Sequence, residues 1–244
     1  MVNNSRNLIE VKQLYKSFLV KGGKVPVLRG IDLSVAEKDF TIIYGPSGCG
    51  KSTLLHTILG LERPTGGKVF IFGKDLYRLT SDERADIRRT KVGMLYQQSN
   101  WIKTFNVQDN VALPLNLLGQ TEQEAGKGAL GVLEQVGLED WRGYVPTELS
   151  AGQQQRVGLA RALISDPEIL IVDEPTGNLD SKAGLELMEL LKVLSRKRGK
   201  TVIMVTHDLR LLTFATRVIE MNDGVIVKEY RGGRLPTIER VKKE

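Results

Sequence analysis

Hydrophobic residues occur in short runs of two kinds along the chain. Residues 8–18 alternate between apolar and polar positions and predict a strand, residues 28–35 predict a second one, and residues 19–26 predict a loop between them. Short unbroken apolar runs instead predict buried strands at 40–45, 92–97, 169–173 and 201–208. Segments with helical spacing lie between these runs, so the pattern predicts an α/β fold with a mostly parallel sheet and an antiparallel β portion near the N-terminus.

The pattern changes between residues 98 and 165, where strand signals disappear and helix formers dominate. We expect an inserted helical subdomain there, an α/β core made of residues 1–97 and 166–230, and a basic tail at 231–244. A hairpin is expected to turn at Asp223 and Gly224. The tail is interpreted as a solvated end, with contact to lipid or to a partner as the alternative.

Composition excludes several classes of protein. The chain has 244 residues, of which 41% are hydrophobic and 26% charged, so it has enough apolar surface for a folded core. A single cysteine, Cys49, excludes an internal disulfide, and two histidines are too few for a multi-histidine metal site. The net charge of +6 is interpreted as a scattered surface charge rather than a nucleic-acid site.

No apolar run approaches the roughly 20 residues that span a bilayer, and the start of the chain has no apolar signal region. We therefore expect a cytoplasmic protein. It would reach a membrane only indirectly, by docking to a protein that spans it.

The strongest motif is a glycine-rich loop that matches G-x-x-x-x-G-K-[ST]. A predicted strand precedes it and a predicted helix follows it, which is the context that phosphate binding requires. The glycines let the backbone approach a phosphate, Lys51 would reach the β- and γ-phosphates, and Ser52 would offer its hydroxyl to Mg²⁺. The residues of the motif are Gly45, Pro46, Ser47, Gly48, Cys49, Gly50, Lys51, Ser52 and Thr53.

Two strand ends carry further polar side chains. The apolar run 169–172 leads into Asp173 and Glu174, which suit a Mg²⁺ ligand and a base for the attacking water, respectively. His207 follows the run 201–206 and is expected to face the γ-phosphate and orient the water. A plain strand-to-loop exit is the alternative for the two carboxylates, and a structural histidine for His207.

Ser150 is a good N-cap for the helix that follows it, and a helix N-terminus is an anion site. The segment Ser150, Ala151, Gly152 and Gln153 would therefore be a second phosphate site. A second site in one chain is redundant unless it serves a nucleotide bound to another copy.

Taken together, the phosphate loop, LSAGQ at 149–153, Asp173 with Glu174, and His207 resemble the nucleotide-binding domain of ATP-binding cassette (ABC) transporters over residues 8–230. The resemblance implies a RecA-like P-loop NTPase core. It implies that Gln97 contacts Mg²⁺ and couples to a membrane subunit, that Asp180 belongs to the D-loop, and that Phe18 stacks on adenine, with Tyr15 as the rival. The family usually has glycine where this chain has Ala151, which puts the contact to the second copy's nucleotide in question.

Several stretches are similar to the LolD/MacB group, among them NVALPL and DEPTGNLDSKAG. The resemblance implies an ATPase that uses ATP and Mg²⁺, forms a homodimer on ATP, and docks to an integral membrane permease at the cytoplasmic face of the inner membrane. Export or an envelope task is the expected function. The alternatives are an FtsE-like regulatory switch on a membrane protein and, less in keeping with a single P-loop, a soluble nucleic-acid-linked ABC protein. In the family a groove beside Gln97 receives the membrane subunit, and Trp101, Ile102 and Phe105 either line that groove or pack in the core.

Overall fold

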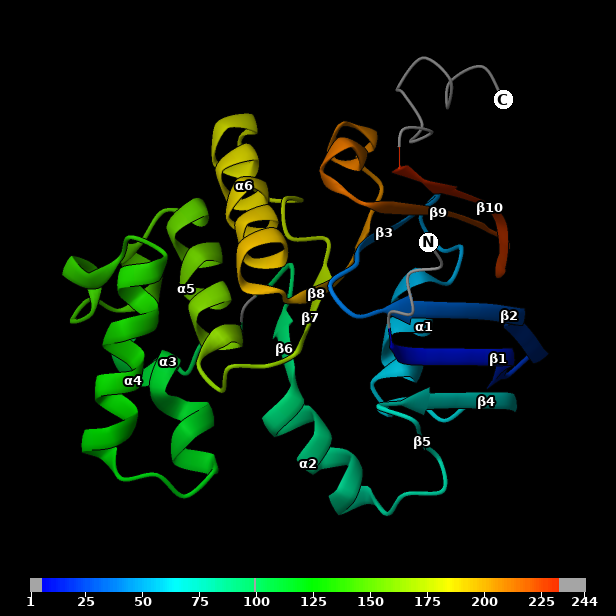
Figure 1. The fold of residues 1–244 in the computed structure, drawn as a ribbon, viewed down its shortest axis with the longest axis horizontal. Helices are drawn as coiled ribbons and strands as arrows, with labels where there is room; N and C mark the ends of the chain where they lie inside the picture. Colours follow the sequence, from blue (N-terminus) through cyan, green and yellow to red (C-terminus); the bar gives the residue numbers. More distant parts are fainter. Residues whose placement is uncertain (1–5, 99, 233–244) are drawn as a thin grey trace. The chain divides into compact units, whose positions relative to one another are not determined.

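The computed structural model describes residues 6–98 and 100–232. Two compact units make up the chain. Unit 1 comprises residues 1–85 and 195–244, and unit 2 comprises residues 86–194. Figure 1 gives the labels of the helices and strands used below.

Unit 1 contains an antiparallel sheet with the strand order β2-β1-β4-β5. Strands β1 (Asn7–Val20) and β2 (Gly23–Ala36) form a long hairpin, followed in the sheet by β4 (Gly66–Ile71) and the two-residue β5 (Lys74–Asp75). The strand predicted at residues 8–18 is confirmed, but the strict alternation is not: Leu8 and Ile9 are both buried, and the pairing register shifts between Val11 and Leu14. The expected antiparallel N-terminal portion is therefore present.

The hairpin predicted at residues 19–26 is present, but the predicted length of its loop is wrong. Both strands extend into it, with Leu19 paired to Lys24 and Phe18 to Val25, so that only residues 21 and 22 form the turn. Pro26 lies within β2, although proline cannot donate to a strand ladder. It is tolerated here because β2 is an edge strand and the ladder is irregular beside Ser17, the residue opposite Pro26.

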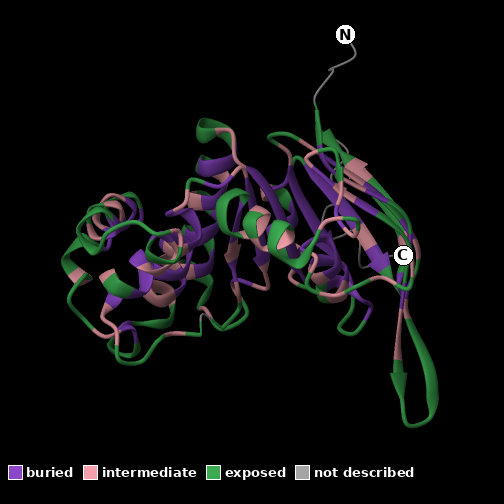
Figure 2. Ribbon diagram, turned by 90° about the horizontal axis from the view of Figure 1, so that it is seen from below, coloured by how far each residue is buried: buried purple, intermediate pink, exposed green. Residues whose placement is uncertain are grey.

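A second group of strands in unit 1 has the order β10-β9-β3-β8. Strand β3 (Phe40–Tyr44) lies parallel to both β8 (Thr201–Thr206) and β9 (Arg217–Asn222), and β10 (Val225–Arg231) closes a hairpin with β9. β3 and β8 are buried along their whole length. Figure 2 shows buried residues of the chain in purple. Helix α1 (Lys51–Ile58) follows β3 and packs against β2 and β4.

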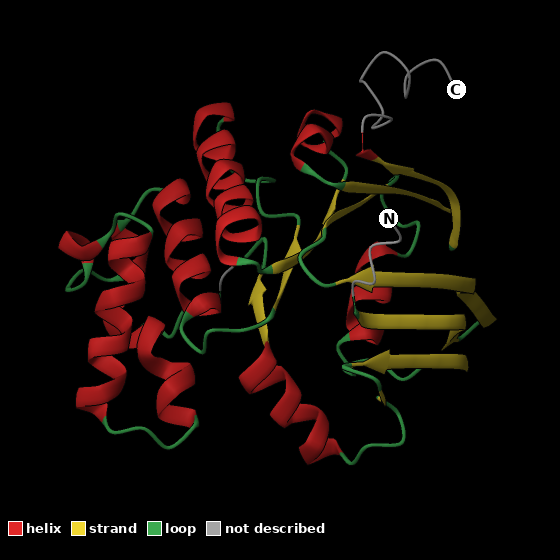
Figure 3. Ribbon diagram, viewed as in Figure 1, coloured by secondary structure: helices red, strands yellow, loops and turns green. Residues whose placement is uncertain are grey.

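Unit 2 combines a parallel strand pair with a helical cluster (Figure 3). The pair is β6 (Val92–Leu95) and β7 (Ile169–Asp173). The cluster is α3 (Val107–Leu117), α4 (Glu122–Gln135) and α5 (Ala151–Leu163), which pack on one another, and α5 also packs on β6. Helices α2 (Ser81–Lys91) and α6 (Ser181–Arg198) run across the boundaries between the units, and short 3-10 helices occupy 139–141, 146–148 and, in unit 1, 209–214.

The predicted fold class is confirmed by this arrangement, with parallel strands between helices, an antiparallel N-terminal sheet and a helical cluster. The predicted domain limits of 97/98 and 165/166 remain a prediction. Unit 2, at residues 86–194, is longer than the predicted helical subdomain because it also contains β6 and β7. Only residues 231 and 232 of the basic tail predicted at 231–244 are described, and the rest of the tail lies outside the described residues. Among the residues that the structure describes, no helix is both long enough and apolar enough to cross a membrane.

Candidate functional site

The glycine-rich loop of unit 1 joins the end of β3 to the start of α1. Gly45 must be glycine because a Cβ there would lie 1.9 Å from the carbonyl oxygen of Met221 on β9. Gly50 is the N-cap of α1 and adopts φ +103°. Because no side chain caps the helix, the backbone amides of its first turn stay available to a ligand. Pro46, Ser47 and Gly48 are exposed, whereas Cys49 is buried. The loop is thus an open backbone cradle at a helix N-terminus, which suits an anion.

Lys51 is the charged group of this cradle. Its side chain is only 6% exposed, and Nζ donates to the carbonyl oxygens of Gly45 at 2.8 Å and Pro46 at 3.0 Å. The ammonium is therefore held over the loop by weak neutral acceptors. A phosphate is a charged acceptor and forms stronger hydrogen bonds with an ammonium than a carbonyl does, so it can replace them.

His207 lies at the same edge of the sheet as the loop. Tyr44 on β3 is paired with Thr206 on β8, so the residues that follow them, Gly45 and His207, emerge side by side. His207 is exposed. The next residue, Asp208, accepts a bidentate pair of hydrogen bonds from Arg210, with Nε donating to Oδ1 and Nη2 to Oδ2, and this contact lowers the pKa of the Asp208 carboxyl.

Phe18 lies near the end of the β1–β2 hairpin and is partly exposed. The ammonium of Lys16 lies 4.7 Å from the centre of its ring. Lys16 is itself 7% exposed and is held by Glu62 and by the carbonyl of Arg63. One face of the Phe18 ring is therefore covered by a fixed cation.

In unit 2 the ends of β6 and β7 bring Gln97 close to the two carboxylates. Leu95 is paired with Val172, so the residues that follow on the two parallel strands emerge at one edge: Tyr96 and Gln97 beside Asp173 and Glu174. Glu174 adopts φ +46°, a left-handed conformation that is costly for a residue with a Cβ. Asp173 and Glu174 are both partly exposed.

The predicted second anion site begins helix α5 and lies in the same unit. Ser150 accepts from the Gln153 amide at 3.3 Å, while the Gln153 side chain accepts from the Ser150 amide at 2.9 Å. Ala151 is exposed, so its methyl group is accessible at the start of the helix. Gly152 is restricted by packing, because a Cβ there would lie 2.9 Å from the Cβ of Ala183 on α6.

Asp180 caps the N-terminus of α6, as Ser150 caps that of α5. Its carboxylate accepts from the amide of Ala183 at 2.8 Å and so closes the first turn of that helix. The predicted role of Asp180 in a nucleotide site stays a prediction.

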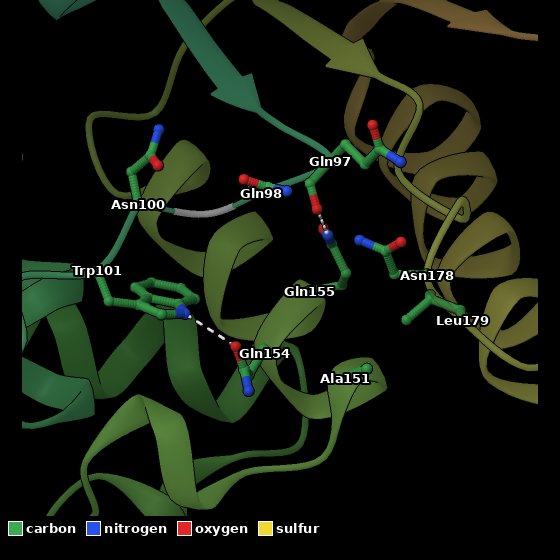
Figure 4. Close-up of a pocket in the computed structure, with 9 residues that line it drawn as sticks. All are labelled: Gln97, Gln98, Asn100, Trp101, Ala151, Gln154, Gln155, Asn178 and Leu179. Carbon is green, nitrogen blue, oxygen red and sulfur yellow. Dashed lines mark hydrogen bonds between the residues drawn. The ribbon is translucent and has the colours of Figure 1, made fainter.

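A pocket of about 290 Å³ lies between these elements of unit 2 (Figure 4). Its lining has no formal charge and is rich in amides. Two dashed contacts in Figure 4 cross it: Trp101 donates to Gln154 at 3.0 Å, and Gln155 donates to the carbonyl of Gln97 at 2.8 Å. The lining residues are Gln97, Gln98, Asn100, Trp101, Ala151, Gln154, Gln155, Asn178 and Leu179.

Trp101, Ile102 and Phe105 do not pack in the core. Ile102 is exposed and the other two are partly exposed. The loop that carries them is instead held from inside by Asn110, whose fully buried amide bonds to the backbone of residues 102, 105 and 106. The core-packing interpretation of these three residues is therefore wrong.

The donor sets fit the groups that the sequence predicted. In unit 1 the open cradle, Lys51 and the hydroxyl of Ser52 suit a polyphosphate. In unit 2 the carboxylate of Asp173 and the amide oxygen of Gln97 are hard oxygen donors of the kind that Mg²⁺ prefers. No cluster of three or more histidine, cysteine or acidic side chains able to hold a metal occurs among residues 6–98 and 100–232. Sequence reasoning missed Asn110 and Gln155, although both stand inside stretches it used, NVALPL and the run of glutamines after LSAGQ.

Comparison with known proteins agrees with this site. Residues 28–177 match the family model described as ABC transporter, which covers more than half of the chain. The chain belongs to the ABC transporter family. An uncharacterized ABC transporter ATP-binding protein of Methanocaldococcus jannaschii is 44% identical over 91% of this chain and 98% of its own length. The predicted family and the predicted ATPase class are confirmed.

Other relatives point to export systems. The lipoprotein-releasing system ATP-binding protein LolD of Hyphomonas neptunium is 39% identical over 90% of this chain and 96% of its own. The macrolide export protein MacB of Aggregatibacter actinomycetemcomitans is 43% identical over 91% of this chain, which spans only 34% of that longer ATP-binding/permease protein.

Solved structures show the same fold. A dimeric ABC transporter cassette superimposes with a TM-score of 0.85 at 40% identity and covers 91% of this chain and 98% of that one. A second dimeric cassette, bound to ADP and phosphate in a post-hydrolysis state, gives the same TM-score at 39% identity, with the same coverage.

Proposed function

We propose that two copies of this chain close head-to-tail around two ATP molecules and that hydrolysis releases them. One observation carries this proposal: the chain has two phosphate-type helix starts, the P-loop with α1 in unit 1 and the exposed start of α5 in unit 2. One nucleotide needs only one P-loop, so the start of α5 is available to a nucleotide held by the other copy. The dimeric cassettes to which the chain is similar support the same arrangement.

Within that dimer, Lys51 and the loop backbone hold the phosphates, and Ser52, Asp173 and Gln97 would hold Mg²⁺. When bound, the ion would supply positive charge that offsets the negative charge of the phosphates. Glu174 takes the proton of the attacking water, and His207 orients that water. Phe18 stacks on the adenine, and Ser150, Ala151, Gly152, Gln153 and Asp180 contact the partner's nucleotide or its surroundings.

Glu174→Gln tests this scheme because it removes the base and keeps the shape. Turnover should fall at least about 100-fold, and saturating Mg-ATP should convert the variant to a stable dimer in size exclusion with light scattering. The wild-type protein, which turns ATP over, should remain largely monomeric under the same conditions. A Glu174→Gln variant that binds ATP with wild-type affinity and stays monomeric would overturn the dimer. A variant with wild-type turnover would overturn the role of Glu174.

We further propose that the chain drives an export system through an integral membrane permease and is held peripherally at the cytoplasmic face of the membrane by that partner. The exposed loop with Trp101, Ile102 and Phe105, beside the pocket at Gln97, is the surface offered to the permease. The similarity to LolD and MacB, which extends over about 90% of this chain, supports a role in export.

Purification of the tagged protein from native membranes in mild detergent tests the partner. A stoichiometric multi-span protein should accompany the wild-type chain, and less of it should accompany Trp101→Ala. Recovery from the soluble fraction with bound nucleic acid would overturn the membrane assignment. A membrane partner whose state responds to ATP while no substrate crosses would identify the chain as a regulatory switch instead.

A further inference from the structure

Gln155 joins the start of α5 to the segment that carries Gln97. It lies two residues beyond Gln153 on α5 and is 5% exposed. Its Nε2 donates to the backbone carbonyl oxygens of Tyr96 at 3.2 Å and Gln97 at 2.8 Å. The second of these bonds is drawn in Figure 4.

The orientation of the Gln155 amide is fixed by its partners. Both partners are carbonyl oxygens, which can only accept, so the NH₂ group must face them and not Oε1. Oε1 is buried and has no hydrogen-bond partner among the described residues. A rotated amide would place an oxygen against two oxygens and break both bonds.

A second tether lies a few residues further along the same segment. Trp101 donates to Gln154, and the guanidinium of Arg161 lies 4.7 Å from the centre of the indole. Gln154, Gln155 and Arg161 all belong to α5. The segment from Tyr96 to Trp101 is therefore attached to one helix at both of its ends.

We propose that Gln155 is a positioning residue that makes the place of Gln97 depend on what the N-terminus of α5 binds. This inference rests on the proposed dimer, in which α5 meets the nucleotide of the other copy while Gln97 serves the nucleotide of its own copy. A phosphate that docks on residues 150–153 pulls on the first turn of α5, and Gln155 passes that shift directly to the backbone of Gln97. Each chain would thus link the two ATP sites of the dimer.

Two near-isosteric variants test the tether, and a third serves as control. Gln155→Met removes the donor, and Gln155→Glu replaces it with an oxygen that cannot donate. Gln98→Leu changes an exposed amide of the same pocket, for which no hydrogen bond is found among residues 6–98 and 100–232. Hydrogen exchange of the backbone amides of residues 96–98 in the nucleotide-free protein should be about tenfold faster in both Gln155 variants and unchanged in the control.

The kinetic readout concerns the reaction itself. In both Gln155 variants kcat should fall about tenfold while the KM for ATP changes less than twofold, because Lys51 and Phe18 lie in the other unit. The Hill coefficient for ATP should fall toward 1. Unchanged exchange would overturn the tether, and faster exchange with wild-type kcat would overturn its role in the reaction. Absence of ATPase in the wild-type protein would instead refute the proposed function, and the exchange measurement would still decide whether the tether exists.

Discussion

The amide of Gly224 donates a hydrogen bond of 3.1 Å to the carbonyl of Cys49, inside the phosphate loop. The carbonyl of Gly224 accepts in turn from the amide of Arg29 on β2, at 2.9 Å. The tight turn between β9 and β10 thus braces the loop from a point about 175 residues later in the chain. The loop's shape depends on this turn as well as on its own glycines.

Gly224→Ala should damage the loop from outside the motif. Gly224 adopts φ +78°, and a Cβ there would lie 2.2 Å from the carbonyl oxygen of Val27. We expect a loss of about 2 kcal/mol or more in the free energy of unfolding, from backbone strain and the displaced strand. ATP affinity should fall about tenfold because the brace on Cys49 moves.

Gly22→Ala is the matched control, since nothing lies within 4 Å of a Cβ at that position. It should change the free energy of unfolding by no more than about 0.5 kcal/mol. Urea unfolding and equilibrium binding of a fluorescent ATP analogue measure the two effects. If Gly224→Ala matches Gly22→Ala in both, the turn does not support the loop.

Phe18 and Tyr15 can be separated by substitution. One face of Phe18 is covered by Lys16, which leaves the other face for a base, whereas the hydroxyl of Tyr15 lies beside Gly30 on β2. Phe18→Leu should raise the KM for ATP about tenfold and leave kcat nearly unchanged, because stacking on an aromatic ring is worth roughly 1–3 kcal/mol per base.

Tyr15→Leu should leave the KM for ATP unchanged. GTP in place of ATP provides a second check, since the loss on Phe18→Leu should be similar for any purine if stacking rather than hydrogen bonding is removed. A larger effect from Tyr15→Leu than from Phe18→Leu would assign the stacking ring to Tyr15.

Asp208 should contribute to stability in a pH-dependent way. Its bidentate contact with Arg210 lowers its pKa below the ordinary value of 3.8. A carboxyl with a lowered pKa in the folded state contributes its full stabilisation above the unfolded pKa and loses it as pH falls through the folded value. The difference in unfolding free energy between wild type and Arg210→Gln should therefore shrink from pH 6 toward pH 2.

The pKa itself can be followed by NMR through the side-chain carboxyl carbon of Asp208. It should rise toward its ordinary value in Arg210→Gln and stay in place in Arg78→Gln, which removes the partner of Asp75 instead. An Asp208 pKa that is the same in wild type and Arg210→Gln would show that the ion pair does not form in solution.

Most helices and strands could be predicted from the sequence because apolar runs and turn residues act on neighbouring positions in the chain. Short, mostly apolar runs rich in β-branched and aromatic side chains, such as residues 40–44, favour buried strands, and Asp223-Gly224 supplies the positive φ angles of a tight hairpin turn. The extension of both strands into residues 19–26 was missed for the same reason. Gly22, Gly23 and Pro26 disfavour a strand locally, and the pairing with β1 overrides them.

The sequence by itself determined the chemistry of the site: a glycine loop that accommodates phosphate, a lysine to bind it, carboxylates at a strand end and a capped helix start, each defined by residues next to one another. The tertiary structure decided what holds these parts. Asn110 clamps the loop after Gln97, Gln155 ties that segment to α5, and Gly224 braces Cys49. These contacts join residues up to about 175 positions apart, and a long-range hydrogen bond between an amide and a backbone carbonyl leaves no periodic pattern in the sequence.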